Sequence, residues 1–245
     1  MEVFRSLNSY KRGPNTIVTI GTFDGVHIGH KYILENIIST AKKSEGESLL
    51  ISFHPHPRMI LRPEDKSLKL LHTLDEKIQL LNSLGLDKLL LIPFSRDFSL
   101  LSSDEYIQRV LVQTVAPKEV VIGYDHRFGH DRKGGIEELQ KYASIHSFRV
   151  REIPAQALDD AKVSSTKIRE ALELGMVETA AKYLGYNYSF GGTVIHGEKM
   201  GRKLGYPTAN IQPDHTHKLI PANGVYLVRV EVQGKRYFGL MNIGR

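Results

Sequence analysis

The chain has 245 residues, of which 41% are hydrophobic and 24% are charged, as in a globular protein rather than a disordered one. It contains no cysteine, which excludes disulfide scaffolds, thiolate zinc sites and cysteine nucleophiles. No apolar stretch approaches the roughly 18 residues of a membrane span or the core of a signal peptide. We therefore expect a cytoplasmic protein with no membrane partner.

The formal net charge of +6 is not spread evenly along the chain. Residues 1–185 carry 25 Lys or Arg and 24 Asp or Glu, whereas residues 186–245 carry 8 and 3. The basic excess therefore lies in a short C-terminal piece. A concave phosphate site fits this distribution as well as a nucleic-acid surface does.

Short apolar runs alternate with helical patterns over the first 185 residues. This alternation predicts a parallel sheet covered by helices on both faces, an α/β domain. Capping patterns at Thr73 with Glu76 and at Ser102 with Glu105 mark two of the helix starts. The expected strands are 16–23, 48–53, 88–94, 119–123 and 148–154, and the expected helices are 32–43, 76–84, 105–115, 136–145, 165–174 and 176–184.

From Tyr186 onward the pattern changes to runs rich in Tyr, Val and Ile, separated by Gly and Pro. This pattern indicates an all-β domain, a small barrel or part of one. About four strands fit into the remaining residues. We therefore expect two domains, residues 1–185 and residues 186–245.

The sequence from Gly21 to His30 lies between the first expected strand and the first expected helix. In an open α/β sheet this is where ligands bind, and a helix N-terminus offers free N–H groups to a phosphate. His27 and His30, on either side of Gly29, are candidate donors to the same anion. Metal binding is the rival interpretation, with His54 and His56 as further ligands, but a His-x-x-His turn without nearby carboxylates is a poor zinc pattern.

Two further polar segments lie at the ends of expected elements, one at the start of a helix and one directly after a strand. In residues 163–169, Ser164 or Ser165 is a natural helix N-cap, and Arg169 lies on the same helical face as Ser165, so that hydroxyl and guanidinium groups can converge on a polyphosphate. Lys162 adds a positive charge. In residues 123–129, Asp125 directly follows a strand, where it can orient a base or a ribose.

Five motifs together resemble the bacterial bifunctional riboflavin kinase/FMN adenylyltransferases, also called FAD synthetases. They occur in the family's order and cover nearly the whole chain. They are GTFDGVHIGH (21–30), SFHPHP (52–57), GYDHRFG (123–129), VSSTKIR (163–169) and GYPTAN (205–210).

The resemblance implies that a Rossmann-like nucleotidyltransferase domain transfers AMP from ATP to FMN, giving FAD and pyrophosphate. It implies catalytic roles for His27, His30 and Arg169. His126 stands where the family often has Phe, Asn is an alternative where this chain has Asp125, and Lys162 stands where Arg is common. The nucleotide-binding residues it implies are Gly21, Thr22, Phe23, Asp24, Gly29, Asp125, Lys162, Ser164, Ser165 and Thr166.

The C-terminal domain resembles riboflavin kinase, which makes FMN from riboflavin and ATP. The resemblance implies that Gly201 and Gly205 lie in a glycine-rich phosphate loop, and that Thr208 and Asn210 are oxygen ligands for Mg²⁺ bound with ATP. Family kinase domains continue past residues 242–244, and their catalytic Glu lies in that continuation. We therefore expect the barrel to be incomplete and riboflavin kinase activity to be absent from this chain.

Two alternatives remain open at this stage. One is another small-molecule nucleotidyltransferase with the same His-x-Gly-His motif. The other is a nucleic-acid-binding protein whose C-terminal aromatic residues stack on bases. The resemblance favours small-molecule substrates, namely ATP, FMN and riboflavin, with no nucleic acid.

Overall fold

The computed structural model describes residues 1–65, 67–154, 163–197, 201 and 205–244. These residues form two compact units. Unit 1 contains residues 1–68 and 74–163, and unit 2 contains residues 69–73 and 164–245. The two helices that we expected to close the first domain thus share their contacts with the C-terminal strands. Each unit is described separately below.

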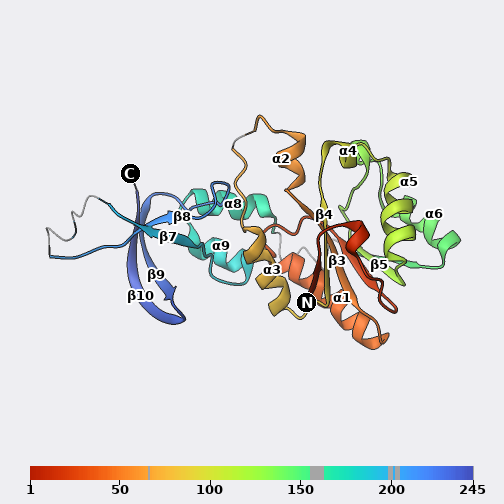
Figure 1. Cartoon of the computed structure of the whole chain (residues 1–245), viewed down its shortest axis with the longest axis horizontal. Helices are drawn as coiled ribbons and strands as arrows, with labels where there is room; N and C mark the ends of the chain where they lie inside the picture. Colours follow the sequence, from red (N-terminus) through yellow and green to blue (C-terminus); the bar gives the residue numbers. More distant parts are fainter. Residues whose placement is uncertain (66, 155–162, 198–200, 202–204, 245) are drawn as a thin grey trace. The chain divides into compact units, whose positions relative to one another are not determined.

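Unit 1 is built on a six-stranded sheet in the order β1-β4-β3-β2-β5-β6, and all of its strand pairs are parallel (Figure 1). The prediction of a parallel α/β sheet is thereby confirmed. The edge strand β1 was not predicted, because it has only three residues in a polar segment. The strands are β1 (Glu2–Phe4), β2 (Ile17–Ile20), β3 (Ser48–His54), β4 (Lys88–Pro93), β5 (Glu119–Gly123) and β6 (Arg149–Ile153).

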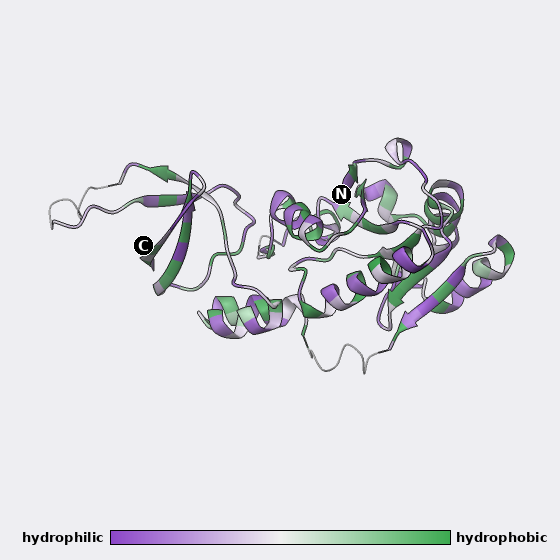
Figure 2. Cartoon of the chain, turned by 90° about the horizontal axis from the view of Figure 1, so that it is seen from below, coloured by the Kyte–Doolittle hydropathy of each residue, from purple (hydrophilic) through white to green (hydrophobic). Residues whose placement is uncertain are grey.

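Helices cover both faces of this sheet. Successive residues of a strand point to opposite sides, and the central strands are buried over consecutive residues, so both faces are apolar and must be covered. On β2, Ile17 belongs to the core cluster that includes residues of α1 and α3, while Val18 belongs to the cluster that includes residues of α6 and of η2, a π-helix. Figure 2 shows the hydrophobic residues along these buried strands. The helices of unit 1 are α1 (Ile28–Lys43), α2 (Pro57–Leu61), α3 (Leu74–Ser83), α4 (Arg96–Ser99), α5 (Ser103–Tyr106), η2 (Ile107–Val115) and α6 (Ile136–His146), with short 3-10 turns η1 (Leu7–Ser9) and η3 (His130–Arg132).

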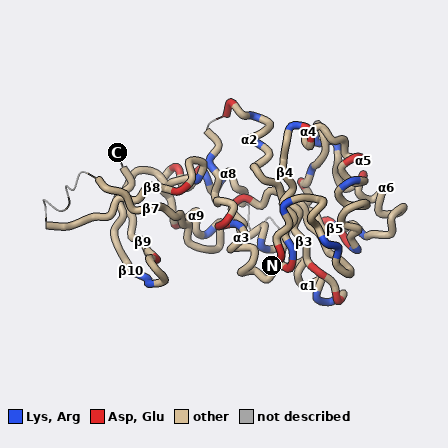
Figure 3. Tube along the Cα trace, viewed as in Figure 1, with Lys and Arg blue, Asp and Glu red and all other residues tan. Residues whose placement is uncertain are grey.

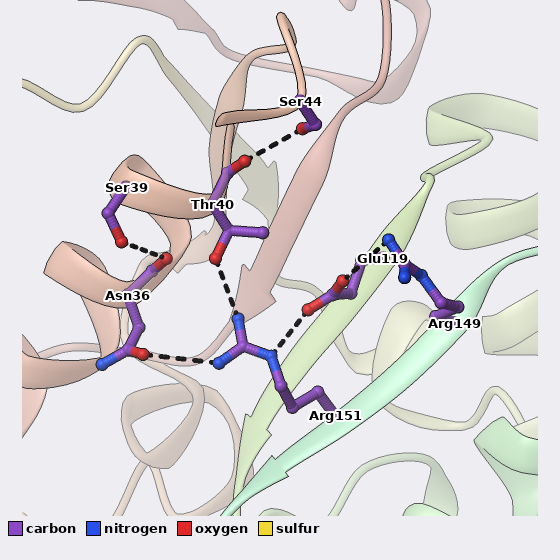
Figure 4. A network of polar contacts seen from close by, with 7 residues as sticks. All are labelled: Asn36, Ser39, Thr40, Ser44, Glu119, Arg149 and Arg151. Carbon is purple, nitrogen blue, oxygen red and sulfur yellow. Dashed lines mark hydrogen bonds and ion pairs between the residues drawn. The ribbon is translucent and has the colours of Figure 1, made fainter. Parts of the chain in front are cut away.

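Helix α1 is fastened to the sheet by a polar network around Arg151 (Figure 4). The Arg151 Nε donates to Glu119 at 2.7 Å, and its two terminal nitrogens donate to Asn36 at 3.3 Å and Thr40 at 3.1 Å. Because Asn36 and Thr40 are one turn apart on α1, the guanidinium fixes the rotation of the helix. The network therefore positions the opposite end of α1, its N-terminus.

Unit 2 contains two helices, two antiparallel strand pairs and the short segment Lys69–Thr73. That segment runs beside Lys218: the Leu70 N–H donates to the carbonyl of His217 at 2.7 Å, and Lys218 Nζ donates to the carbonyl of Leu71 at 2.8 Å. β7 pairs with β8, and β9 pairs with β10. The elements are α8 (Ser165–Glu173), α9 (Val177–Leu184), β7 (Gly192–Ile195), β8 (Asn210–Pro213), β9 (Gly224–Val232) and β10 (Lys235–Ile243).

The charge distribution of unit 1 and the hydropathy of the described helices can be compared with the sequence analysis. Figure 3 shows Lys and Arg interspersed with Asp and Glu along unit 1, in agreement with its balanced composition. Within the ranges that the structure describes, none of the helices combines the length and hydropathy that crossing a membrane requires.

We predict that Arg151→Met lowers the free energy of unfolding by about 1–3 kcal/mol, because it leaves the buried Glu119 carboxylate without its shortest ion pair. Arg149→Met is the matched control, since Arg149 contacts the same carboxylate at 3.5 Å but its side chain is 71% exposed. It should cost less than about 0.5 kcal/mol. Urea denaturation measures both variants, and equal losses would contradict the assigned role of Arg151.

Candidate active site

The Gly21–His30 segment lies where the order of the sheet reverses. From β2 the chain builds outward through β3 and β4 on one side, then returns to add β5 and β6 on the other. The turn after β2 and the Gly123–Phe128 loop after β5 therefore begin at neighbouring strand ends. In open α/β sheets, this switch point at the carboxyl ends of the strands is where ligands bind.

The turn between β2 and α1 has an unusual backbone. Phe23, Gly25 and Val26 have φ angles of +48°, +92° and +36°, in the left-handed region that side chains with a Cβ rarely adopt. Phe23 and Val26 are 4% and 0% exposed, so burial of their side chains holds the strained conformation. The turn brings the chain directly into α1.

Helix α1 begins at Ile28, four residues earlier than expected, because His27 is its N-cap. The backbone N–H of His30 donates to Nδ1 of His27 at 3.3 Å. The two imidazole rings are stacked with centroids 3.6 Å apart, and Phe23 stacks on His30 at 4.5 Å. Both histidines thus belong to the first turn of the helix, where backbone N–H groups and the helix dipole favour an anion.

His27 is neutral at physiological pH. Burial lowers its pKa to about 4, although the Asp24 carboxylate acts in the opposite direction. Because Nδ1 accepts the hydrogen bond from His30, the proton of the neutral ring is assigned to Nε2. His27 therefore offers one oriented N–H donor rather than a positive charge.

A buried polar cluster lies behind the turn, and our sequence analysis missed it. Lys77 of α3 is only 9% exposed, and its Nζ donates to the carbonyl oxygen of Thr22 and to the hydroxyl of Ser52, both at 3.1 Å. The available signal was a lysine on the apolar stripe of a predicted helix, between Leu74 and Leu81. Such a position calls for a polar partner inside the protein.

The loop after β5 carries the expected Asp125, which is exposed, and His126, whose pKa is lowered to about 4 by burial. Phe128 is buried and is held by two backbone hydrogen bonds to Gly134. Its ring is 5.4 Å from that of Tyr106, which begins a row of aromatic contacts through Phe98 to residues at the ends of β3 and β4, Phe53 and Phe94.

The serine motif forms the start of α8 in unit 2. Ser164 is the N-cap and accepts from the Lys167 N–H at 3.3 Å, while Arg169 Nε donates to the carbonyl of Lys69 at 2.7 Å. Ser165 is half-buried and Thr166 is exposed. Lys162 lies outside the described residues. Because His27 belongs to unit 1, the convergence of α8 with the histidine pair stays a prediction.

Of the residues expected to hold Mg²⁺ and ATP, Thr208 and Asn210 line a cavity of about 230 Å³ in unit 2, between residues 194–197 and 207–210, whereas Gly201 and Gly205 are not part of its lining. A Cβ on Gly197 would lie 1.8 Å from Asn210 Nδ2, and one on Gly201 would lie 2.3 Å from the carbonyl oxygen of Tyr206. Gly201 thus requires glycine, because the atom it would meet is backbone, whereas a side chain at 197 would have to displace the Asn210 side chain. Thr208 and Asn210 are on the same wall, and Gly205 has a φ of +82°.

The described strands of unit 2 do not form a closed barrel. They form two separate two-stranded sheets. Large apolar side chains on β9 and β10 are in contact with solvent, and exposed apolar patches of this kind are uncommon on monomeric proteins. The most exposed are Val225, Leu227, Phe238 and Leu240, at 71%, 79%, 82% and 78%.

Comparison with known proteins places both units in one family. A family model described as FAD synthetase matches residues 10–167, and one described as riboflavin kinase matches residues 184–245. The first alone covers more than half of the chain.

Several curated relatives carry the name bifunctional riboflavin kinase/FMN adenylyltransferase. The protein of Buchnera aphidicola subsp. Schizaphis graminum is 40% identical over 100% of this chain and 78% of its own length. The Listeria monocytogenes protein is 36% identical over 94% of this chain and 72% of its own length. The Escherichia coli K12 protein is 32% identical, with coverage of 100% and 78%.

A crystal structure described as a macrolide-efflux protein from Streptococcus pneumoniae has the same fold, with a TM-score of 0.87 and 30% identity. The similarity covers 99% of this chain and 78% of that one. The order of the motifs, the sheet topology and these matches agree. The chain belongs to the bifunctional riboflavin kinase/FMN adenylyltransferase family.

Proposed function

We propose that unit 1 transfers AMP from ATP to FMN, releasing pyrophosphate and giving FAD. The observation that carries this proposal is the start of α1 at the sheet's switch point, capped by a neutral His27 with its Nε2–H available as a donor. Family membership supplies the substrates, and this helix start supplies a place for the phosphates of ATP.

The reaction requires no general base, because its nucleophile, the phosphate of FMN, is anionic at neutral pH. It requires instead that two phosphates be held in line and that charge on the transition state and pyrophosphate be stabilised. The α1 N–H groups and the His27 and His30 imidazoles provide hydrogen bonds for this charge. On this proposal, Ser165, Thr166 and Arg169 of α8 hold the triphosphate from its other side.

The flavin is proposed to bind toward the loop after β5. The half-buried rings of Phe53, Phe94 and Phe98 contact one another at strand ends of the same sheet edge, and aromatic side chains suit a planar, mostly apolar ring system. Asp125 at the start of this loop is exposed and can accept hydrogen bonds from a ribityl or ribose hydroxyl.

Mg²⁺ fits the donor set in unit 2. Thr208 and Asn210 line one cavity, and their side chains carry a hydroxyl and an amide oxygen; oxygen ligands together with phosphates are the preference of Mg²⁺. When bound, the ion neutralises phosphate charge. Gly197 and Gly201 allow the backbone to approach the phosphates closely.

The proposed adenylyl transfer predicts that the purified chain converts FMN and ATP to FAD and pyrophosphate in the presence of Mg²⁺. Chromatography of the flavins and a coupled pyrophosphate assay measure both products. Replacing FMN by a phosphopantetheine or nicotinamide mononucleotide tests the alternative substrates of the superfamily. Turnover of those compounds without turnover of FMN would refute the proposal.

We predict that His27→Asn lowers the rate of FAD formation about 100-fold while the fold is kept. Asparagine is a good N-cap, so its side-chain oxygen can still accept from the His30 N–H, but the Nε2–H donor is lost. His30→Ala should also lower the rate about 100-fold or more. His146→Asn, at an exposed position of α6, is the control. Wild-type turnover in His27→Asn would remove this imidazole from the mechanism.

We also predict that this 245-residue chain does not phosphorylate riboflavin. Among the described residues, the β9–β10 sheet is open and exposes Leu227 and Leu240, so these strands do not close a barrel around a substrate. Incubation with riboflavin, ATP and Mg²⁺, followed by chromatography for FMN, measures the activity. Formation of FMN at a rate comparable to that of FAD synthesis would contradict the prediction.

A further inference from the structure

Lys77 joins three parts of the phosphate site. It lies on α3, and its Nζ donates to the carbonyl of Thr22 in the turn and to the hydroxyl of Ser52 on β3. The Ser52 hydroxyl itself donates to the same Thr22 carbonyl at 3.3 Å. The carbonyl that precedes the strained Phe23 is thus held by two donors from other elements.

The charges that face Lys77 are those of the candidate site. Asp24, 6% exposed, attracts its ammonium group and also interacts with His27. His54, at the end of β3, is close enough for Lys77 to help lower its pKa, together with burial and Arg5. Asp24 is the carboxylate among these groups, and it raises the pKa of His27, a histidine expected to bind an anion.

A buried carboxylate beside a triphosphate site is a problem for binding, because charges inside a protein are poorly screened by salt. A buried positive charge near Asp24 offsets this repulsion. Lys77 is such a charge, because Asp24 attracts its ammonium group and hydrogen bonds to Thr22 and Ser52 hold that group in place.

We propose that Lys77 is a positioning residue for ATP, whose ammonium group neutralises Asp24 and holds the Thr22 carbonyl so that the turn accepts the triphosphate. The inference rests on the proposed phosphate site at His27 and His30. Lys77 lies outside the sequence motifs, and its proposed role depends on the positive charge of its ammonium group.

This dependence on charge makes the inference measurable. Burial lowers the pKa of Lys77 to about 8 from the ordinary 10.5. His27 and His54 have lowered pKa values and stay neutral above pH 7, and phosphate groups with a second pKa of about 6 are ionised by pH 8, so neither titrates in the range where Lys77 does. Loss of the Lys77 proton above pH 8 should therefore weaken ATP binding.

The same titration has the opposite effect on folding. Between pH 8 and 10.5 the unfolded chain binds a proton at Lys77 that the folded chain has lost, so this group makes the folded state more stable as the pH rises. A role of Lys77 in stability alone therefore predicts no loss of ATP affinity in this range.

The test is the KM for ATP and the kcat of FAD formation from pH 7 to 9.5. For the wild-type chain we expect KM to rise about tenfold above pH 8, with kcat changed less than about twofold. Lys77→Met keeps the apolar stem and should raise KM about tenfold at pH 7.5. Its KM should then be independent of pH.

Lys88→Met is the matched control. Lys88 is also a buried lysine of unit 1, 4% exposed, but it begins β4 at the opposite end of the sheet, where it pairs with Glu47 at 2.6 Å. Its loss should lower the temperature of unfolding and leave both KM for ATP and the pH dependence of KM as in the wild type.

A KM for ATP that is constant from pH 7 to 9.5 in the wild-type chain would overturn the inference, even if Lys77→Met does not fold. A Lys77→Met variant with the KM and pH profile of the wild type would overturn it as well. In both cases FAD is still formed, so the proposed function stands. Absence of FAD formation by the wild-type chain would instead reject the proposed function.

Discussion

The hydrogen bond from the His30 N–H to Nδ1 of His27 is the interaction on which the site depends. It starts α1 at the end of β2, and it leaves the proton of the neutral His27 ring on Nε2. One hydrogen bond thus orients both the N-terminus of α1 and the His27 imidazole, the two groups that we propose bind phosphate. On the proposed function, His27 consequently contributes a directed hydrogen bond rather than a positive charge.

The rest of unit 1 keeps this helix start in place. At one end of the sheet, Arg151 ties α1 to β5 and β6, which fixes the rotation of the helix. At the other, Lys77 holds the carbonyl of Thr22 and faces the buried charge of Asp24. Neither residue belongs to a recognisable motif. Each is a long, positively charged side chain that donates hydrogen bonds to a neighbouring element: Arg151 to side chains of α1, and Lys77 to the Thr22 carbonyl.

The sequence was sufficient to predict the parallel sheet and the histidine turn, because buried strands and glycine-rich turns leave strong local patterns. It did not reveal β1, whose three residues are too few for a pattern, or the true start of α1, because histidine is an uncommon N-cap. The partners of Lys77 are 25 and 55 residues away, so no local pattern records them. The convergence of α8 with the histidine turn stays a prediction, because the two belong to different units.

The central claim is that the His27–His30 turn and the start of α8 bind one triphosphate. Two-dimensional NMR of the labelled chain, titrated with a non-hydrolysable ATP analogue, tests it most directly. The account predicts that the His27 and His30 imidazole signals and the Ser165 and Thr166 amide signals shift together, with one shared saturation curve. Shifts confined to one of the two clusters, or two curves with different midpoints, would contradict it.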